Sequence, residues 1–396
     1  MKSKTNLFLL RRRWLLVAAL YILSILLFYW LWRFEKGLAY GNQWLVQTAL
    51  IATYCLWVVW RNLLENHRPG EQAVLAMFGW GNRLTLLRGL LISMIAGFLF
   101  IPWPAGRLAW LPAVLYTTAD IADFLDGYAA RITNHVTQLG SRLDVEFDSL
   151  GMLIVSLLAV WYGQLPQWYL LIGLARYFFL IGLWVREKRN LPNQPLPHSQ
   201  HRRIFAGFQM SFMSVVLWPI LPAEAATIAG TIFALATSAG FIRDWLIVVG
   251  HLDAQSDSYR LWQRQAYQLL TDYLPPVARF VFSGCMLVVV QQLDPVWQPA
   301  GWVALFTNWH LPWAALLATF FAIIGLAASV MIALGIMSRI MAIVVMFPLG
   351  FDMVVNGANL FNSIAMACGV LVMIFGSGAL SLWQPDDDFV LRRAGE

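Results

Sequence analysis

Charged residues are scarce in this chain of 396 residues, at 12% against roughly 25% in an average soluble domain. Hydrophobic residues make up 60% of the sequence, which excludes an ordinary soluble globular protein. Apolar stretches close to the roughly 20 residues that a bilayer requires recur along the chain. The composition therefore predicts an all-α, polytopic integral membrane protein.

Cysteine is also rare, with only Cys55, Cys285 and Cys368, each inside an apolar stretch and without CxxC or CxxH spacing. This pattern argues against a disulfide framework and against a metal-thiolate site. We expect all three to be small, buried, apolar side chains.

Twelve stretches are candidate membrane spans, and most should be helical. They cover about 14–33, 43–60, 84–103, 109–131, 143–163, 166–186, 204–221, 224–247, 276–292, 312–334, 339–355 and 360–383. The first has basic flanks, but it is too long for a signal peptide and lacks a small-residue cleavage site. We therefore expect it to be an uncleaved anchor.

The positive charges predict the topology. The net charge is +6, and basic clusters occur at the N-terminus and at 61–68, 83–88, 186–203 and 392–393. If twelve spans alternate, these clusters share one side, which the positive-inside rule predicts to be cytoplasmic. We expect an inner (cytoplasmic) membrane protein with both termini facing the cytoplasm and with contacts to anionic membrane lipids. Nothing in the pattern suggests a nucleic-acid partner.

The chain divides into three predicted blocks. Residues 1–70 hold two N-terminal spans, residues 80–250 hold six, and residues 270–385 hold four. The polar segment 251–268 is the longest non-apolar stretch, and it predicts the boundary between the second and third blocks.

Four aspartates gather in the second block despite the general scarcity of charge. If 109–131 is a helix, Asp123 and Asp126 lie on one face together with Gly127 and Ala130. This stripe combines two carboxylates with two residues that have almost no side chain.

The next span repeats the arrangement. Asp144 and Asp148 are four residues apart, and Gly140 precedes Asp144 by one turn. The connection between the two spans is short, so we expect antiparallel neighbours with both acid pairs near their cytoplasmic ends. Asp120 lies one turn deeper than Asp123 on nearly the same face.

Four converging carboxylates at a membrane boundary would repel one another unless cations neutralised them. All-oxygen ligation favours Mg²⁺, Mn²⁺ or Ca²⁺ over Zn²⁺. A carboxylate-bound metal pair suits phosphate chemistry, because it stabilises charge on phosphate and leaving-group oxygens. The alternative, unrelated surface acids at helix ends, does not explain two matched stripes.

These residues carry a resemblance to a known family. The pattern Asp123-x2-Asp126-Gly127-x2-Ala130-Arg131-x8-Gly140-x3-Asp144-x3-Asp148 is similar to the signature of the CDP-alcohol phosphotransferase (phosphatidyltransferase) family at every fixed position. Residues 82–88, NRLTLLR, look like the N-x-L-T-x-x-R that often opens the family's first helix, although Gly81 replaces the usual proline. The resemblance covers about 80–250, where the six predicted spans equal the family's six-helix core.

The resemblance implies a transferase of phospholipid biosynthesis. It would move a phosphoalcohol group from a CDP-alcohol, usually CDP-diacylglycerol, to the hydroxyl of a small alcohol or lipid and release CMP. By position, the four aspartates would hold two divalent ions, Mg²⁺ or Mn²⁺, and Asp148 would also be the base. Gly127, Ala130 and Gly140 would let the cytidine nucleotide approach closely, and Arg131 would meet phosphate or nucleotide. A homodimer is compatible with the resemblance.

Other polar residues are candidates for binding a phosphate of the donor or acceptor: Asn82, Thr85, Arg88, Arg176, Arg202 and Arg203. Arg176 lies near the middle of an apolar span, where a charge is costly and often functional. The alternative for Arg176 is an ion pair with Asp120. Arg243 and Asp244 are adjacent, and we expect a local pair.

The third block is similar to the DoxX-like family of small four-helix membrane proteins at 335–342 and 376–382. It shows no catalytic constellation, and an accessory or lipid-handling role is the hypothesis. For the whole chain, the alternative to an enzyme is a non-catalytic interaction or transport protein on the same scaffold. The intact aspartates argue against it, because such a scaffold would have no reason to tolerate their repulsion. The acceptor alcohol stays open.

Overall fold

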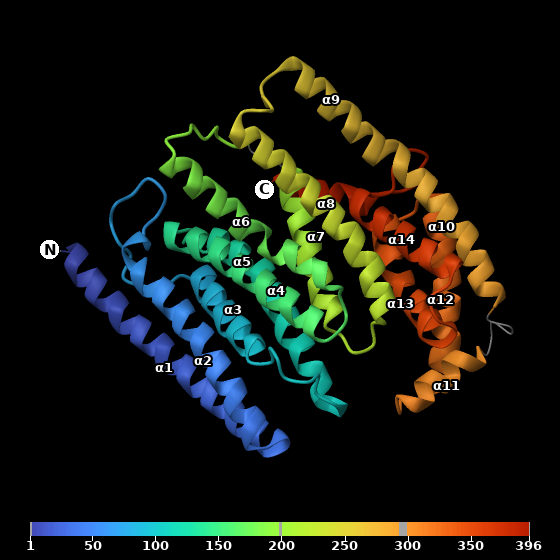
Figure 1. Ribbon diagram of the computed structural model, residues 1–396, viewed down its shortest axis with the longest axis horizontal. Helices are drawn as coiled ribbons and strands as arrows, with labels where there is room; N and C mark the ends of the chain where they lie inside the picture. The colour runs from blue at the N-terminus through green and yellow to red at the C-terminus, as the bar shows by residue number, and fades with distance from the viewer. Residues whose placement is uncertain (1, 198–199, 293–298, 396) are drawn as a thin grey trace. The chain divides into compact units, whose positions relative to one another are not determined.

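The computed structural model describes residues 2–197, 200–292 and 299–395, with side chains described at 5–35, 37–197, 204–292 and 299–390. In these residues α-helices are joined by connections of different lengths, of which 62–79 is among the longer ones, and no β-strand occurs (Figure 1). The chain forms two compact units, 1–176 with 210–219, and 177–209 with 220–396. The predicted all-α class is confirmed.

Five complete helices belong to the first unit. They are α1 (Lys2–Lys36), α2 (Leu38–Arg61), α3 (Trp80–Ala96), α4 (Leu111–Ile132) and α5 (Gln138–Trp161). The unit also takes the beginning of α6 (Leu170–Lys188) and the end of α7 (Gln200–Val216).

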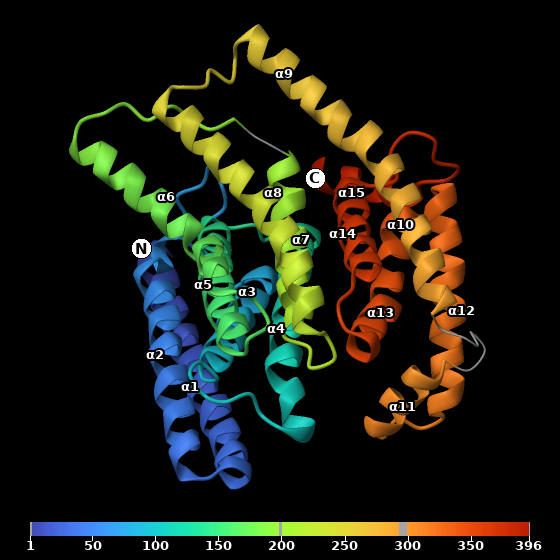
Figure 2. The same cartoon turned by 45° about the vertical axis from the view of Figure 1, so that its right-hand side comes forward.

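The first two helices form a hairpin that lies against α3. Helices α1 and α2 run side by side in both views (Figure 2), and the turn between them is made at Gly37, whose φ of 82° suits glycine. Trp32 and Trp44 pack on Phe98 just after α3. The hydroxyl of Tyr21 donates a hydrogen bond to the backbone of α3 at Leu86. The hairpin thus fixes the position of α3.

Helix α3 packs against both α4 and α5. Glycines allow this approach, because a Cβ added at Gly81 would lie 2.8 Å from the Cβ of Ala130, and one at Gly89 would lie 2.8 Å from the ring of Phe147. The prediction that α4 and α5 are direct neighbours needs a correction, since each packs more extensively on α3 than on the other. Helix α5 is capped by the preceding residue Thr137, whose hydroxyl accepts from the backbone N–H of Gly140 at 3.1 Å.

The second unit contains the remaining helices and the other parts of α6 and α7. They are α8 (Ala223–Val249), α9 (Asp257–Gln268), α10 (Leu274–Gln291), α11 (Ala300–Asn308), α12 (Ala314–Leu334), α13 (Ser338–Asn356), α14 (Leu360–Phe375) and α15 (Pro385–Gly395). The chain passes from the first unit to the second after Arg176, which lies inside the predicted block 80–250. The division into the blocks 1–70, 80–250 and 270–385 remains a prediction.

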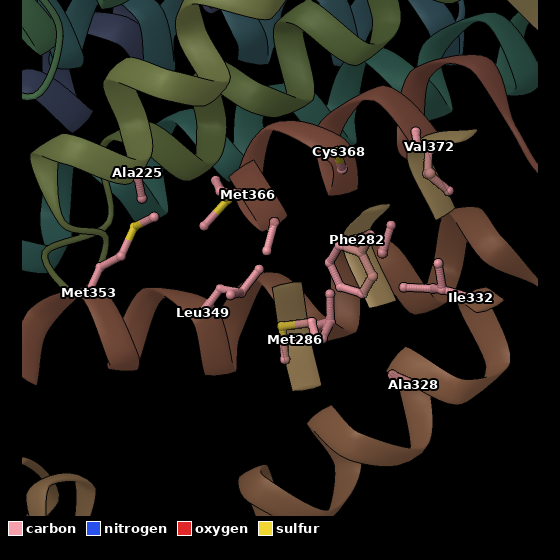
Figure 3. Close-up of a cluster of buried hydrophobic side chains, with 14 residues drawn as sticks. Ala225, Phe282, Met286, Ala328, Ile332, Leu349, Met353, Met366, Cys368 and Val372 are labelled. Carbon is pink, nitrogen blue, oxygen red and sulfur yellow. The ribbon is translucent and has the colours of Figure 1, made fainter. Parts of the chain in front are cut away.

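A hydrophobic core holds the second unit together. Figure 3 shows Phe282 and Met286 of α10, Leu349 of α13 and Met366 of α14 lying toward one another, with Ala225 of α8 beside them. Helix α14 packs on α8, α10 and α13. A helix from the predicted second block therefore shares a core with helices of the third.

The glycine-rich segment 376–382 is held directly by buried Arg279, and indirectly by buried Arg339 through Asp387, which accepts from the backbone N–H of Ser377 at 2.8 Å. Arg279 donates to the backbone carbonyls of Ser377 at 2.6 Å and Leu380 at 3.1 Å. The Nε of Arg339 contacts Asp387 of α15 at 2.5 Å. Residues 335–342 and 376–382 therefore have a packing role in this unit.

Eight helical segments are long and apolar enough to cross a membrane in the part of the chain that the structure describes: 5–35, 38–61, 106–132, 167–188, 223–249, 257–291, 314–334 and 338–356. The chain is a multi-pass membrane protein. The count of twelve spans is not confirmed. Helix α3 ends at Ala96 and is followed by a turn in which Phe100 has a φ of 58°, with Pro102 and Pro104 beyond it. Helix α14 ends at Phe375 because Gly376 adopts a φ of 95°.

The prediction that the cysteines are buried is confirmed for Cys55 and Cys368, whereas Cys285 is half-buried; all three are free thiols.

Candidate active site

Four carboxylates meet around the guanidinium of Arg88. Its Nη1 lies 2.6 Å from Asp123, 3.1 Å from Asp126 and 2.8 Å from Asp144, and its Nη2 donates to Asp148. Arg88 comes from α3, the first two aspartates from α4 and the last two from α5. The structure therefore brings the two acid stripes together, with an arginine between them.

The solvent exposure of the side chains increases from one end of the site, its buried floor, to the other, its open mouth. Side-chain exposure is 2% for Arg88 and 11% for Asp126, then 28% for Asp123, 34% for Asp148 and 43% for Asp144. This gradient follows from the helix packing, because Arg88 lies on the helix that contacts both others. A ligand that enters would meet Asp144 and Asp148 first.

The site has an excess of negative charge and offers oxygen ligands. Four carboxylates and one guanidinium leave three formal negative charges. Asp123, Asp126 and Asp144 each place one carboxylate oxygen within 4.8 Å of the others. A compact set of oxygens fits Mg²⁺ or Mn²⁺ better than metals that prefer sulfur or nitrogen. The donor set therefore fits the divalent ions predicted from the sequence.

The other residues of the 82–88 element bond to protein groups. The hydroxyl of Thr85 donates to Asp126 at 2.9 Å. The side-chain amide of Asn82 donates to Asn66 at 3.0 Å and to Thr137 at 3.1 Å. These bonds orient one carboxylate and tie the start of α3 to the start of α5. Phosphate binding by this element remains a prediction.

The small residues of the signature differ in their surroundings. A Cβ added at Gly127 would meet only the Arg131 side chain, with Nη1 at 3.3 Å, so this glycine borders open space. A Cβ at Gly140 would lie 2.6 Å from Oδ1 of Asn82, so this glycine makes room for a protein side chain. Ala130 packs on Gly81. Gly127 therefore borders open space next to Asp126, beside the exposed Arg131.

The remaining predicted residues lie apart from this cluster. Asp120 accepts a hydrogen bond from Ser214 at 3.1 Å. Arg176 is half-buried, and among the described side chains no carboxylate lies within ion-pair distance of it, so the alternative pairing with Asp120 is not observed. The side chains of Arg202 and Arg203 lie outside the described residues.

One local prediction is confirmed by the structure. Arg243 and Asp244 form the expected pair, with Nη2 to Oδ1 at 2.6 Å.

The central position of Arg88 was missed by the sequence reasoning, which grouped it with residues that bind phosphate. A signal was present. Arg88 is a charged residue inside the apolar stretch 84–103, and such a residue needs an intramembrane partner of opposite charge.

Comparison with known proteins places this site in a family context. The sequence model of the family described as CDP-alcohol phosphatidyltransferase matches residues 79–251. A CDP-diacylglycerol–glycerol-3-phosphate 3-phosphatidyltransferase of Rickettsia bellii is 35% identical over 138 residues, 34% of this chain and 73% of the relative. The enzyme with the same name from Bacillus subtilis is 32% identical over 117 residues, 27% of this chain and 61% of the relative.

A putative cardiolipin synthase of Mycobacterium tuberculosis is 29% identical over 140 residues, 34% of this chain and 63% of the relative. The chain thus spans somewhat under two thirds of the Bacillus and Mycobacterium relatives. No solved structure gives a significant match. The likeness of residues 270–385 to the DoxX-like family remains a prediction.

Proposed function

The chain belongs to the CDP-alcohol phosphatidyltransferase family, and from this premise we propose that it transfers a phosphatidyl group from CDP-diacylglycerol or another CDP-alcohol to an acceptor hydroxyl. The convergence of four carboxylates around one buried guanidinium is the main support for this proposal. In the reaction, the acceptor oxygen forms a bond to the phosphorus that carries the diacylglycerol, the phosphoanhydride bond breaks, and CMP leaves.

Each side chain of the site has a role in the proposal. Asp123, Asp126, Asp144 and Asp148 would hold two divalent ions, Mg²⁺ or Mn²⁺, which stabilise negative charge on phosphate oxygens when bound. Asp148 accepts the proton of the acceptor hydroxyl, a role that follows from the family resemblance. Arg131 is exposed beside Gly127 and would neutralise a phosphate of the donor.

The buried side supports these groups. Thr85 holds Asp126 by a hydrogen bond, and Asn82 links α3 to the beginning of α5 through Thr137. A non-catalytic interaction or transport protein does not account for four carboxylates held within reach of one guanidinium.

The proposal extends to the acceptor and the location. Glycerol 3-phosphate is the first acceptor to test, because it appears in the names of several relatives, and a phospholipid with a free hydroxyl is the second. The basic clusters favour an inner-membrane protein with the site and both termini facing the cytoplasm. A homodimer is part of the same proposal.

The test is a CMP-release assay. Membranes that contain the protein would be incubated with CDP-diacylglycerol, Mg²⁺ or Mn²⁺ and a panel of alcohols: glycerol 3-phosphate, serine, inositol phosphate and a hydroxyl-bearing phospholipid. We expect CMP release that depends on one of these acceptors. If no alcohol and no CDP-linked donor yields CMP, the proposed activity is wrong.

Arg176 provides a test of acceptor binding. Its guanidinium is half-buried in an apolar helix without a carboxylate partner among the described side chains, so a phosphate on the acceptor would offer it an anion. We expect Arg176→Ala to raise KM about tenfold or more for a phosphorylated acceptor, the equivalent of one lost charge-assisted bond of roughly 1.4 kcal/mol or more. Unphosphorylated acceptors should be turned over as before. Equal loss with both kinds of acceptor would contradict this role.

Gly127 and Gly140 form a matched pair for locating the nucleotide. Gly127→Ala should stabilise α4 by about 0.5–1 kcal/mol, because alanine is the better helix former and its Cβ would meet only Arg131. The same methyl should raise KM for the CDP donor about tenfold if the nucleotide lies on this surface. Gly140→Ala should instead lower Tm, because its Cβ would lie 2.6 Å from Oδ1 of Asn82. An unchanged donor KM in Gly127→Ala would place the nucleotide elsewhere.

A further inference from the structure

The guanidinium of Arg88 lies where a bound cation would lie. Its Nη1 is 2.6, 3.1 and 2.8 Å from Asp123, Asp126 and Asp144. These are the same three residues whose carboxylate oxygens lie within 4.8 Å of one another. Mg²⁺ binds its oxygen ligands at roughly 2.0–2.1 Å and would need that central position. Nη1 and a divalent ion therefore cannot occupy it together.

Arg88 is held in this position by a helix that is packed on several sides. Its side chain is 2% exposed, and α3 is packed by α2, α4 and α5. The hydroxyl of Tyr21 bonds to the backbone at Leu86, and Gly89 fits against Phe147. The ion pairs are thus a built-in feature of the core of this unit, unlike a surface arginine that reaches acids by chance.

The two ends of the guanidinium have different partners. Nη1 faces the three carboxylates that could share an ion, whereas Nη2 donates to Asp148. An ion at the centre would thus compete with Nη1 alone, while the Asp148 contact of Nη2 lies outside the contested position.

Building on the proposed function, we propose that Arg88 is an internal counter-ion that holds the four carboxylates together until a divalent ion displaces it from their centre. Buried carboxylates without a cation are strongly destabilising, so Arg88 would keep the site assembled when no ion is bound. The same contact makes Arg88 a competitor of the ion. By linkage, removing Arg88 must weaken the ion-free protein and strengthen ion binding.

The experiment measures Mn²⁺ binding and stability on the full-length protein in detergent. Wild type and Arg88→Gln are purified with Mn²⁺ present and stripped with chelator, and Mn²⁺ is titrated back while free ion is followed by electron paramagnetic resonance. We expect Arg88→Gln to bind Mn²⁺ at least about tenfold more tightly than wild type. Its Tm in chelator should fall below that of wild type, and the rise in Tm on adding Mn²⁺ should be larger. Arg88→Lys keeps the positive charge but loses the two-ended guanidinium, so its Mn²⁺ affinity and Tm should lie between those of wild type and Arg88→Gln.

Two arginine variants serve as controls. Arg83→Gln changes the same helix at an exposed position that stacks on Trp80, and should leave Mn²⁺ affinity and Tm unaltered. Arg279→Gln removes a fully buried guanidinium that bonds to backbone carbonyls. It should lower Tm equally with and without Mn²⁺ and leave Mn²⁺ affinity unchanged. A merely structural Arg88 would behave like Arg279.

The outcomes separate this inference from the proposed function. Arg88→Gln that binds Mn²⁺ no more tightly than wild type overturns the inference, and so does the absence of Mn²⁺ binding in both proteins. Tighter binding in the variant supports it, even if no acceptor gives CMP, a result that would contradict only the proposed activity. If Arg88→Gln yields no folded protein with Mn²⁺ present throughout, the comparison is made with Arg88→Lys by the same criterion.

Discussion

Asp148→Asn is expected to lower CMP release by about 10²- to 10⁴-fold, the range that general-base catalysis contributes, while the protein stays folded in the membrane. Asparagine has the shape of aspartate and an oxygen that can still accept from Arg88. It cannot take up the proton of the acceptor hydroxyl. Because the side chain lies toward the mouth of the site, at 34% exposure, the change should cost little packing. The measurement is CMP release at saturating donor and metal.

Glu146→Gln is the matched control for this variant. Glu146 lies on the same helix, is half-buried and is two residues from Asp148, so it points to another face of α5. It should keep wild-type CMP release. Wild-type activity in Asp148→Asn would remove Asp148 from the mechanism. If activity is lost as expected, the Mn²⁺ affinity of the variant separates the two proposed roles of Asp148. Unchanged affinity indicates a base, and weakened affinity indicates a metal ligand.

Removal of divalent ions is expected to abolish CMP release entirely. Three formal negative charges remain in the site after Arg88 is counted, and the donor brings a charged pyrophosphate to the same place. Without added positive charge, the donor and the carboxylates would repel one another. After exhaustive chelation, Mg²⁺ or Mn²⁺ should restore activity. If two ions act together, the dependence of rate on free metal should be steeper than that of a single site.

Asp126→Asn provides a second test of the metal requirement. Asp126 is the most buried of the four aspartates and is held by Thr85 and Arg88, so the amide should fold in place but bind an ion more weakly. Its activity should need more metal than wild type does. CMP release that continues in the fully chelated wild-type protein would show that the carboxylates hold no essential ion.

Local spacing explains how much of the site could be predicted from the sequence. Residues three or four apart on a helix share a face, so the pairs Asp123 with Asp126 and Asp144 with Asp148 follow from the chain itself. The structure brings the two pairs together, which the periodicity of each helix permits but does not by itself require. Their roles remain predictions until the variants above are measured.

Tertiary packing explains what the sequence could not show. Arg88 reaches the centre because α3 packs on both acid-bearing helices, and no local pattern records which helix lies between two others. Gly140 belongs to the same sequence signature as Gly127, yet its missing side chain makes room for Asn82, whereas Gly127 borders open space. Helices α3 and α14 end earlier than hydropathy predicts, because backbone turns interrupt the apolar stretches, at Phe100 (φ 58°) after α3 and at Gly376 (φ 95°) after α14.

The packing of α8 on α14 has a consequence for the order in which the protein is made. Helix α8 belongs to the residues that match the family, whereas α14 is synthesised only after α9 to α13 have followed it. Its partner side chains, such as Met366, therefore do not exist when α8 leaves the ribosome. During synthesis α8 must wait, with an apolar face exposed to lipid or to the insertion machinery, until nearly the whole chain has been translated. The C-terminal helices thus act on the family region as a late-arriving folding partner encoded in the same chain.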